Sequence, residues 1–393
     1  MPALSNDKYI LYAMPASLYS GKARSYLRKR RIEHVERANG HPDYRQRVVP
    51  AIGRMIIPVL QTPDGRLIQD TVDIIDFLEQ AEPREHSIYP PGPCQRAVAH
   101  TLELFGGEGL LRPAMHYRWN FDDTNLPFLR EDFGGALAAG GDPQARDAAF
   151  EMASQLMRKA TTGVGVTPEV TDEIERSYAE FLQLFSAHLR SAPYLLGGLP
   201  SNGDFGFIAP LWAHLARDPY PSRLMKSTAW PVYRWVERMN APVDDTSEHL
   251  DYPQRFFPDD EVPETLRALL RYVADEQLPE MVAQVAFIDE YLASEEGVAE
   301  GAVVAGKPSR RAIGTVTFEW RERPMTIRVL PYRLYLLQRL QATVAECMPD
   351  DRARIRALFG QCGLERLLDL RPRRSIRREN NHEVWGAEQA PSL

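Results

Sequence analysis

The sequence predicts an α/β domain, then an all-α domain, then an additional extension of helices and strands. Three observations support this prediction. Residues 8–80 alternate short β-rich segments with helical periodicity. From residue 94 to about 240, the apolar residues keep helical spacing with almost no strand-like alternation. Beyond residue 250, two segments of period-2 alternation stand among further helical stretches.

The first domain is predicted element by element. Alternation and β-branched content predict the strands, and Pro63-Asp64-Gly65 supplies the chemistry of a tight turn. This order, βαβ followed by ββα, is that of a thioredoxin-like sandwich, which we place in residues 1–85. Its expected elements are a strand at 8–13, a helix at 18–30, a strand at 33–38, a strand within 55–60 that enters a hairpin, and a helix at 71–80.

A proline-rich joint at 82–93 marks the first boundary, because clustered prolines break helices and favour extended linkers. The all-α domain is expected at 92–243 and the extension at 250–393. Long helices are expected at 94–118, 144–160 and 168–190.

Within the extension, Pro279 is expected to kink or break a helix near 263–293. The segments 314–320 and 325–329 predict a hairpin, followed by helices near 331–347 and 350–369. The run 371–378 carries five arginines in eight residues and predicts either a solvated tail or an intramolecular clamp.

Composition narrows the classes of function. The 393 residues carry a net charge of −7, which disfavours nucleic acid and anionic membrane surfaces as partners. Neither a basic leader before an apolar run nor an apolar stretch of membrane-spanning length is present, so we expect a cytoplasmic protein. The three cysteines lack paired spacing and the histidines are scattered, so we expect no metal site. Small molecules and proteins remain as partners.

Two polar positions open predicted helices and can bind charged groups. Ser17 stands where the first strand ends and a helix begins, so its hydroxyl and the helix end can stabilise an anion such as a thiolate. Asp70 and Thr71 open a later helix, where the carboxylate can accept from an ammonium group while backbone N–H groups bind a carboxylate. Both positions also fit plain helix capping.

Three segments, taken together, resemble the glutathione transferase family of the serine type. They are PASLYSGKAR (15–24), IIPVL (56–60) and QDTVDIIDFL (69–78). The segment at 194–212, with Ser201 and Asp204 spaced as a capping box, resembles the start of the family's buried helix. Residues 230–242 look like its closing helix, so the resemblance covers about residues 8–243.

The resemblance implies a site and its residues. Ser17 takes the place of the serine that stabilises the glutathione thiolate, and the Ile57–Pro58 bond corresponds to a cis-proline step. Tyr12, Tyr19 and Ser20 could each take the role of Ser17, with Tyr12 ranked second. The residues expected to bind glutathione are Ile57, Pro58, Asp70 and Thr71, with Arg54 as a substitute where Ile56 replaces a polar residue.

The second substrate is expected to be a hydrophobic electrophile. The residues expected to line its pocket are Met14, Met115, Tyr117 and Trp119. On the same segment, Arg112, His116 and Arg118 fit either selection of an anionic substrate or, as we favour, a solvated helix face.

The expected function follows from the family. The resemblance implies an enzyme that activates glutathione, its co-substrate, for attack on an electrophilic carbon, and it implies a homodimer. Two further functions stay open. One is that of a non-catalytic binding or scaffold protein with the same fold, and the second is that of a glutathione-dependent lyase, isomerase or peroxidase.

Overall fold

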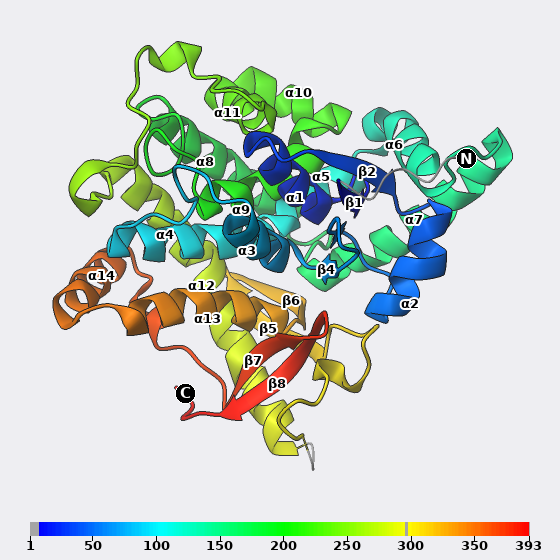
Figure 1. The fold of residues 1–393 in the computed structure, drawn as a ribbon. Helices are drawn as coiled ribbons and strands as arrows, with labels where there is room; N and C mark the ends of the chain where they lie inside the picture. The colour runs from blue at the N-terminus through cyan, green and yellow to red at the C-terminus, as the bar shows by residue number, and fades with distance from the viewer. Residues whose placement is uncertain (1–7, 295–297, 393) are drawn as a thin grey trace. The chain divides into compact units, whose positions relative to one another are not determined.

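The computed structural model describes residues 8–294 and 298–392. By its internal contacts the chain forms two compact units. Figure 1 labels their helices and strands. Unit 1 comprises residues up to Ser87, Tyr117–Ala160 and Ile208–Asp245, and unit 2 comprises Ile88–His116, Thr161–Phe207 and the residues from Thr246 onward. The division into three domains that the sequence suggests stays a prediction.

Unit 1 contains the predicted thioredoxin-like domain. Its four-stranded sheet, within the described residues, has the order β2-β1-β3-β4. The first two strands pair in parallel, and the other neighbours pair antiparallel. The elements are β1 (Tyr9–Ala13), α1 (Leu18–Lys29), β2 (His34–Ala38), α2 (Val49–Ile52), β3 (Val59–Gln61), β4 (Leu67–Gln69) and α3 (Thr71–Ala81).

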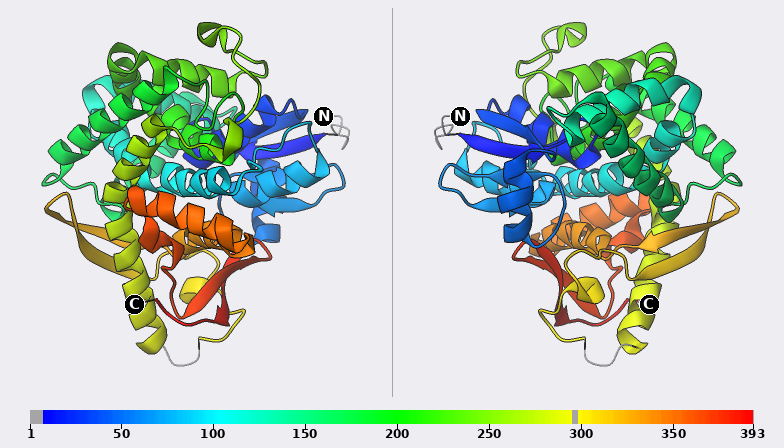
Figure 2. Two further views of the ribbon diagram at one scale, coloured as in Figure 1. Left: turned by 90° about the vertical axis from the view of Figure 1, so that its left-hand side faces the viewer. Right: turned by 90° about the vertical axis from the view of Figure 1, so that its right-hand side faces the viewer.

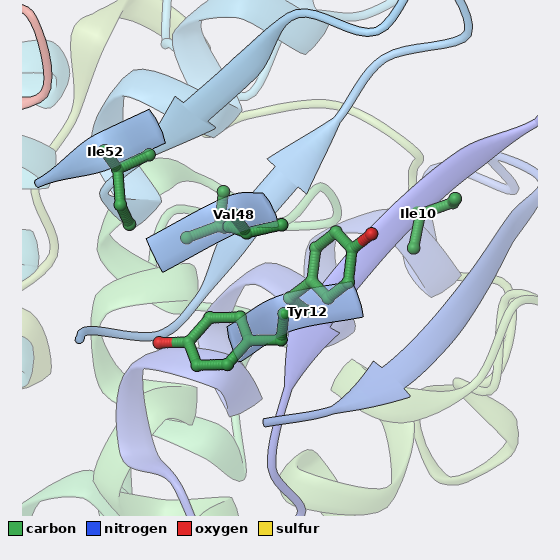
Figure 3. Packing of buried hydrophobic residues seen from close by; sticks show 6 residues of the cluster. Ile10, Tyr12, Val48 and Ile52 are labelled. Carbon is green, nitrogen blue, oxygen red and sulfur yellow. The ribbon is translucent and has the colours of Figure 1, made fainter. Parts of the chain in front are cut away.

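Alternation along β1 sends its side chains to both faces of the sheet. On one face Ile10 and Tyr12 pack with Val48 and Ile52, which come from the segment before β3 (Figure 3). The elements expected from the sequence included no helix between the strand at 33–38 and the strand within 55–60. Instead Tyr44–Val48 is helical and runs into α2, whose first turn accommodates Pro50 because proline needs no N–H donor at that position.

Unit 1 also contains helices from later in the chain. The predicted closing helix is α11 (Trp230–Asn240), and it packs on α1. Ser25 Oγ donates to the Met239 carbonyl at 2.8 Å, which joins the two helices. The others are the end of α5 (Leu111–Trp119), α6 (Asp122–Leu137), α7 (Pro143–Thr161), the end of α9 (Asn202–Pro210) and α10 (Pro219–Thr228).

Unit 2 combines a helical core with the C-terminal extension. The helix α8 (Thr171–Leu189) buries Ile174, Tyr178, Phe181 and Phe185, a spacing that places them on one face. Its other elements are α4 (Pro93–Leu104), α12 (Glu264–Ser294), β5 (Gly314–Trp320), β6 (Arg323–Val329), α13 (Tyr332–Glu346), α14 (Pro349–Gln361), β7 (Arg374–Glu379) and β8 (His382–Glu388).

The extension packs against this helical core (Figure 2). α12 contacts α8 and β5, while α13 contacts α4 and β7. The prediction that Pro279 breaks this helix is wrong, because α12 runs from Glu264 to Ser294 with Pro279 inside it, and a kink stays a prediction. Asp275, whose carbonyl would bond to residue 279, is exposed, so water can satisfy that carbonyl.

The arginine-rich run is a clamp rather than a solvated tail. It enters a second hairpin, β7–β8, which the sequence analysis missed. Arg374 pairs with Glu388 at 2.8 Å, and Arg378 pairs with Glu383 at 2.8 Å. These ion pairs join the two strands across the hairpin.

Candidate functional site

The sheet of unit 1 gathers three of the predicted segments at one end. Tyr12 of β1 lies opposite Val59 of β3, and Val59 lies opposite Gln69 of β4. Because both pairs are antiparallel, the end of β1, the start of β3 and the end of β4 lie side by side. The loop to Ser17, the step before Val59 and the Asp70–Thr71 segment therefore leave the sheet at the same end.

Ser17 is the N-cap of α1. Its backbone is extended, with φ −83° and ψ 123°, and its Oγ accepts from the Ser20 N–H at 3.3 Å. The side chain is partly exposed, so the hydroxyl hydrogen can serve a ligand. The first turn of α1 adds backbone N–H groups and the positive end of the helix dipole. The geometry is that of a helix N-cap, and stabilisation of an anion by Ser17 stays a prediction.

Arg118 holds the loop that carries Ser17. Its Nη1 donates to the Ala16 carbonyl at 2.7 Å, and its Nη2 donates to the Ala213 carbonyl at 2.6 Å. Its guanidinium also forms a two-pronged ion pair with Asp218 at 2.7 and 2.9 Å. Each of these residues belongs to unit 1, and both charged side chains are buried. The backbone before Ser17 is thus fixed by a buried cation.

The solvated helix face predicted for Arg112, His116 and Arg118 is wrong. All three side chains are buried, and each has an acidic partner. Helical spacing alone could not reveal this, because the partners come from segments far along the chain. Selection of an anionic substrate loses its support as well, since Arg118 already binds Asp218 and two carbonyls.

The step before β3 has the cis peptide bond that the resemblance implies, between Ile57 and Pro58. Tyr44 donates its hydroxyl to the preceding carbonyl, that of Ile56, at 2.8 Å. Pro58 is buried and Ile57 is half-buried. Their contact with a peptide ligand stays a prediction.

Asp70 caps α3 in an unusual backbone conformation. Its φ is +92°, a region that L-residues other than glycine rarely adopt, and its Oδ1 accepts from the Val72 N–H at 3.0 Å. Strained residues of this kind cluster at ligand-binding positions. Arg54 Nη2 donates to Gln69 Oε1, so the predicted Arg54 contacts the segment that contains Asp70 and Thr71.

Comparison with known proteins agrees with this geometry. Residues 11–86 match the family model described as the glutathione S-transferase N-terminal domain. These residues belong to that family. No curated protein matches the chain.

Several solved structures are similar to part of the chain. A beta-etherase from Sphingobium sp. strain SYK-6 is 19% identical, covers 61% of this chain and 98% of its own, and has a TM-score of 0.43. A glutathione transferase from Phanerochaete chrysosporium is 14% identical over 60% of this chain and 97% of its own, with a TM-score of 0.41. A rice glutathione transferase, solved with glutathione, is 18% identical over 62% and 91%, with a TM-score of 0.38.

In this glutathione transferase N-terminal domain, Tyr12 sits in a closed polar cluster. Its hydroxyl donates to Asp43 at 2.5 Å, and that carboxylate also binds Arg37 and Arg47. Burial, together with the hydrogen bond to Asp43, raises the pKa of Tyr12 above its usual value. A phenol that already donates its hydrogen to a carboxylate is a poorer hydrogen-bond donor to a thiolate than the partly exposed Ser17 hydroxyl.

Tyr19 and Ser20 both lie on α1, the helix that Ser17 caps. Ser20 is buried, and its Oγ accepts from the Met14 N–H at 3.3 Å. Tyr19 is partly exposed. The structure therefore gives Ser20 a partner inside the loop, while Ser17 keeps the more open hydroxyl.

The residues predicted to bind an electrophile are all buried. Tyr117 packs against Phe121 and Tyr220, with ring centroids 5.4 and 6.1 Å away, and those two rings stack on each other at 3.8 Å. Trp119 packs edge-on against Phe133 at 5.8 Å. Met14 belongs to unit 1 with these aromatics, whereas Met115 belongs to unit 2. A pocket formed by these residues stays a prediction.

Residues 8–294 and 298–392 contain neither a metal-binding cluster nor a membrane-spanning helix. No group of three His, Cys, Asp or Glu side chains in those ranges is placed to hold a metal ion. No helix in the same ranges is long and apolar enough to cross a membrane.

Proposed function

We propose that the protein is a glutathione transferase-like enzyme, which binds glutathione at the sheet end of unit 1 and activates its thiol for attack on an electrophilic small molecule. The observation that supports this most directly is the convergence of Ser17 with Asp70 and Thr71 at that end. One group suits a thiolate, and the others suit the γ-glutamyl end of the same tripeptide.

Ser17 would act on the thiol. A cysteine-type thiol with a pKa near 8.5 is only about 3% ionised at pH 7, and lowering that pKa by about two units makes the thiolate the major form. The Ser17 hydroxyl donates one hydrogen bond to the sulfur, and the start of α1 adds partial positive charge. Arg118 is a positioning residue, because it holds the Ala16 carbonyl next to Ser17.

Asp70 and Thr71 would bind the γ-glutamyl end. A carboxylate offers about four lone-pair positions, so Asp70 can accept from an ammonium group while it caps Val72. The N–H groups at the start of α3 suit the α-carboxylate of the ligand. The Ile57 backbone would align the cysteinyl part between these ends.

The reaction needs no protein nucleophile. The glutathione thiol releases its proton to solvent, the sulfur lone pair forms a bond to the electrophilic carbon, and the leaving group departs with its bonding pair. Catalysis is then a matter of thiol pKa and orientation. The proposal includes a cytoplasmic location and a homodimer, which fractionation and light scattering would test.

Calorimetric titration with glutathione, followed by conjugation of an activated aryl chloride, tests the proposal. Ser17→Ala should keep glutathione affinity within a few-fold but lower kcat/KM about 25-fold at pH 7, because a two-unit rise in thiol pKa reduces the thiolate from roughly three-quarters to about 3%. Ser20→Ala tests the neighbouring hydroxyl, and Ser227→Ala, at an exposed serine on α10, is the matched control.

The outcomes separate the possible functions. Absence of glutathione binding at millimolar concentration would refute the glutathione site altogether. Binding without conjugation across a panel of electrophiles would favour the non-catalytic binding protein. Products of ether cleavage, isomerisation or peroxide reduction would favour a glutathione-dependent lyase, isomerase or peroxidase. Full activity in Ser17→Ala would remove only Ser17 from its role.

A further inference from the structure

We propose that the C-terminal extension has a second binding site, for a small organic dianion of the phosphate-monoester type. The site is an open pocket of about 540 Å³ between α13, α14 and the chain that leads into β7. Pockets of this size bind small molecules. All of its lining residues belong to unit 2, so this inference does not depend on the glutathione site.

The pocket is positively charged in a protein whose net charge is −7. Three arginines, Arg352, Arg356 and Arg371, line it against one acidic residue, Asp369. Arg352 and Arg356 are four residues apart on α14 and so project from the same side of that helix. The lining therefore carries an excess of cationic charge that the protein does not neutralise within it.

The three arginines differ in what they bind. Arg356 is neutralised by Asp369, with contacts of 2.8 and 3.0 Å, and by Glu365 at 3.1 Å. The Arg371 side chain donates only to the Asp369 carbonyl, at 3.1 Å, among the residues that the structure describes. Over the same residues, the exposed guanidinium of Arg352 has no hydrogen-bond or ion-pair partner. Two guanidiniums are thus available to a ligand, which matches a dianion.

The walls of the pocket are already fixed. Gln338 Nε2 donates to the Ile376 carbonyl at 2.7 Å, and Gln338 Oε1 accepts from the Ile376 N–H at 2.8 Å. Gln341 Nε2 donates to the carbonyls of Leu367 and Leu370 at 2.9 and 2.7 Å. These bonds tie α13 to the chain on the opposite side, so little ordering is needed when a ligand binds.

The remaining lining residues favour a ligand with a compact apolar body. Leu368 supplies a buried apolar side chain, and Ala342 leaves space because its side chain is a single methyl group. A guanidinium presents paired donors that match phosphate oxygens, and this match is stronger than that of a single carboxylate. Phenyl phosphate, a dianion with a compact apolar body, is therefore the suitable probe.

The experiment uses the full chain and calorimetric titration with phenyl phosphate, inorganic phosphate and benzoate at fixed ionic strength. Phenyl phosphate should bind with one-to-one stoichiometry and more tightly than the other two. Arg352→Gln and Arg371→Gln should each weaken it about tenfold, the equivalent of one charge-assisted hydrogen bond. Arg366→Gln is the matched control, because Arg366 is exposed in the same region but outside the lining.

Each contrary outcome overturns the proposal. Lack of saturable binding up to about 10 mM phenyl phosphate would refute the site, because pockets that serve a ligand bind it at least this tightly. An equal loss in Arg366→Gln would show only general charge attraction, and competition by glutathione would place the probe in unit 1 instead. Because Arg352 and Arg366 are exposed, unchanged thermal unfolding should verify that both variants fold. Glutathione titrations of the same variants keep failure of this site distinct from failure of the proposed enzyme function.

Discussion

Two groups of polar side chains, one in each unit, differ in their burial and in their hydrogen-bond and ion-pair partners. At the sheet end of unit 1, Ser17 is partly exposed and Asp70 caps a helix in a strained conformation. Inside unit 2, buried arginines and glutamates satisfy each other. A buried charge without a partner is costly, so the paired charges of unit 2 serve the fold, whereas we propose that the groups at the sheet end serve a ligand.

The cluster in unit 2 joins the extension to the helical core. Arg333 of α13 donates to Glu108 at 3.0 Å and also contacts Glu280 of α12. Arg112 donates to Glu280 at 2.9 Å. Glu276 accepts from Arg321 at 2.5 Å and from Arg112 at 3.5 Å, so the residues form a connected network. Its members come from segments more than 200 residues apart, so it fixes the extension in place.

Removing one member of that network should have the largest effect on stability. In Arg333→Leu, the carboxylates of Glu108 and Glu280 lose a buried partner, and we expect the free energy of unfolding to fall by about 3–5 kcal/mol. Urea unfolding measures this. Kinetic constants for glutathione, taken on the folded fraction, should not change.

The control is an exposed ion pair in the same unit. Arg176 contacts Glu173 and is more than half exposed, so Arg176→Ala should cost less than about 1 kcal/mol. The double variant Glu108→Gln with Arg333→Gln should recover part of the loss. Equal destabilisation by Arg176→Ala would contradict the contrast between buried and exposed charges.

Replacing Arg118, the buried cation of unit 1, should lower both stability and activity. Arg118→Met leaves Asp218 buried without its partner, which we expect to cost about 3 kcal/mol. It also frees the Ala16 carbonyl next to Ser17. Because a small displacement of the group that hydrogen-bonds the thiolate slows the reaction, kcat/KM should fall at least about tenfold. The apparent thiol pKa of bound glutathione should rise, a readout that a purely structural residue would not change.

Arg118→Lys distinguishes charge from geometry. Lysine keeps the positive charge beside Asp218 but cannot reach the carboxylate and both carbonyls at once. Stability should therefore recover more than activity. Equal recovery of both would mean that the Ala16 contact does not matter for Ser17.

The thioredoxin-like domain was predictable because its determinants are local. Alternation marks β1, and Pro63-Asp64-Gly65 marks the hairpin between β3 and β4. The second hairpin of the extension had a signal too. Asn380 and Asn381 have φ values of 49° and 67°, and two asparagines between alternating segments are typical of such a turn.

The support behind Ser17 was not predictable in the same way. Arg118 acquires its role from Asp218, which lies 100 residues further along the chain. No local pattern distinguishes an arginine that meets such a partner from one that faces solvent. The sequence therefore indicated Ser17 and Asp70 as candidate ligand positions but not the buried Arg118 and Asp218 behind Ser17.

A pH effect on stability should arise at a buried histidine of unit 2. His188 of α8 is fully buried, its Nε2–H donates to the Leu195 carbonyl at 3.0 Å, and Nδ1 lies 2.9 Å from Thr265 Oγ1. Burial lowers the pKa of His188 to about 4. In the unfolded chain the pKa of this histidine is near 6.5. Between about pH 4 and pH 6.5 the unfolded chain therefore binds a proton at His188 that the folded chain does not bind.

Stability from His188 is thus fully present above about pH 6.5 and falls as the pH decreases toward 4, by about 3 kcal/mol in total. Urea unfolding across this range, compared between wild type and His188→Gln, measures it. The variant should show a flatter profile, and subtracting the two curves removes the contribution of carboxylates. Parallel curves would contradict the assignment to His188.

The smallest change in stability is expected at Asp70, where capping and ligand binding can be separated. Asparagine at this position can still accept from the Val72 N–H, and asparagine tolerates positive φ, so Asp70→Asn should change stability by less than about 0.5 kcal/mol. Glutathione affinity should nevertheless fall about tenfold, since the ammonium group loses a charged acceptor. Asp70→Ala removes the cap as well and should cost about 1 kcal/mol. If Asp70→Asn bound glutathione as wild type does, the strained carboxylate would serve only the helix, and the contrast between the two units would lose one of its two main supports.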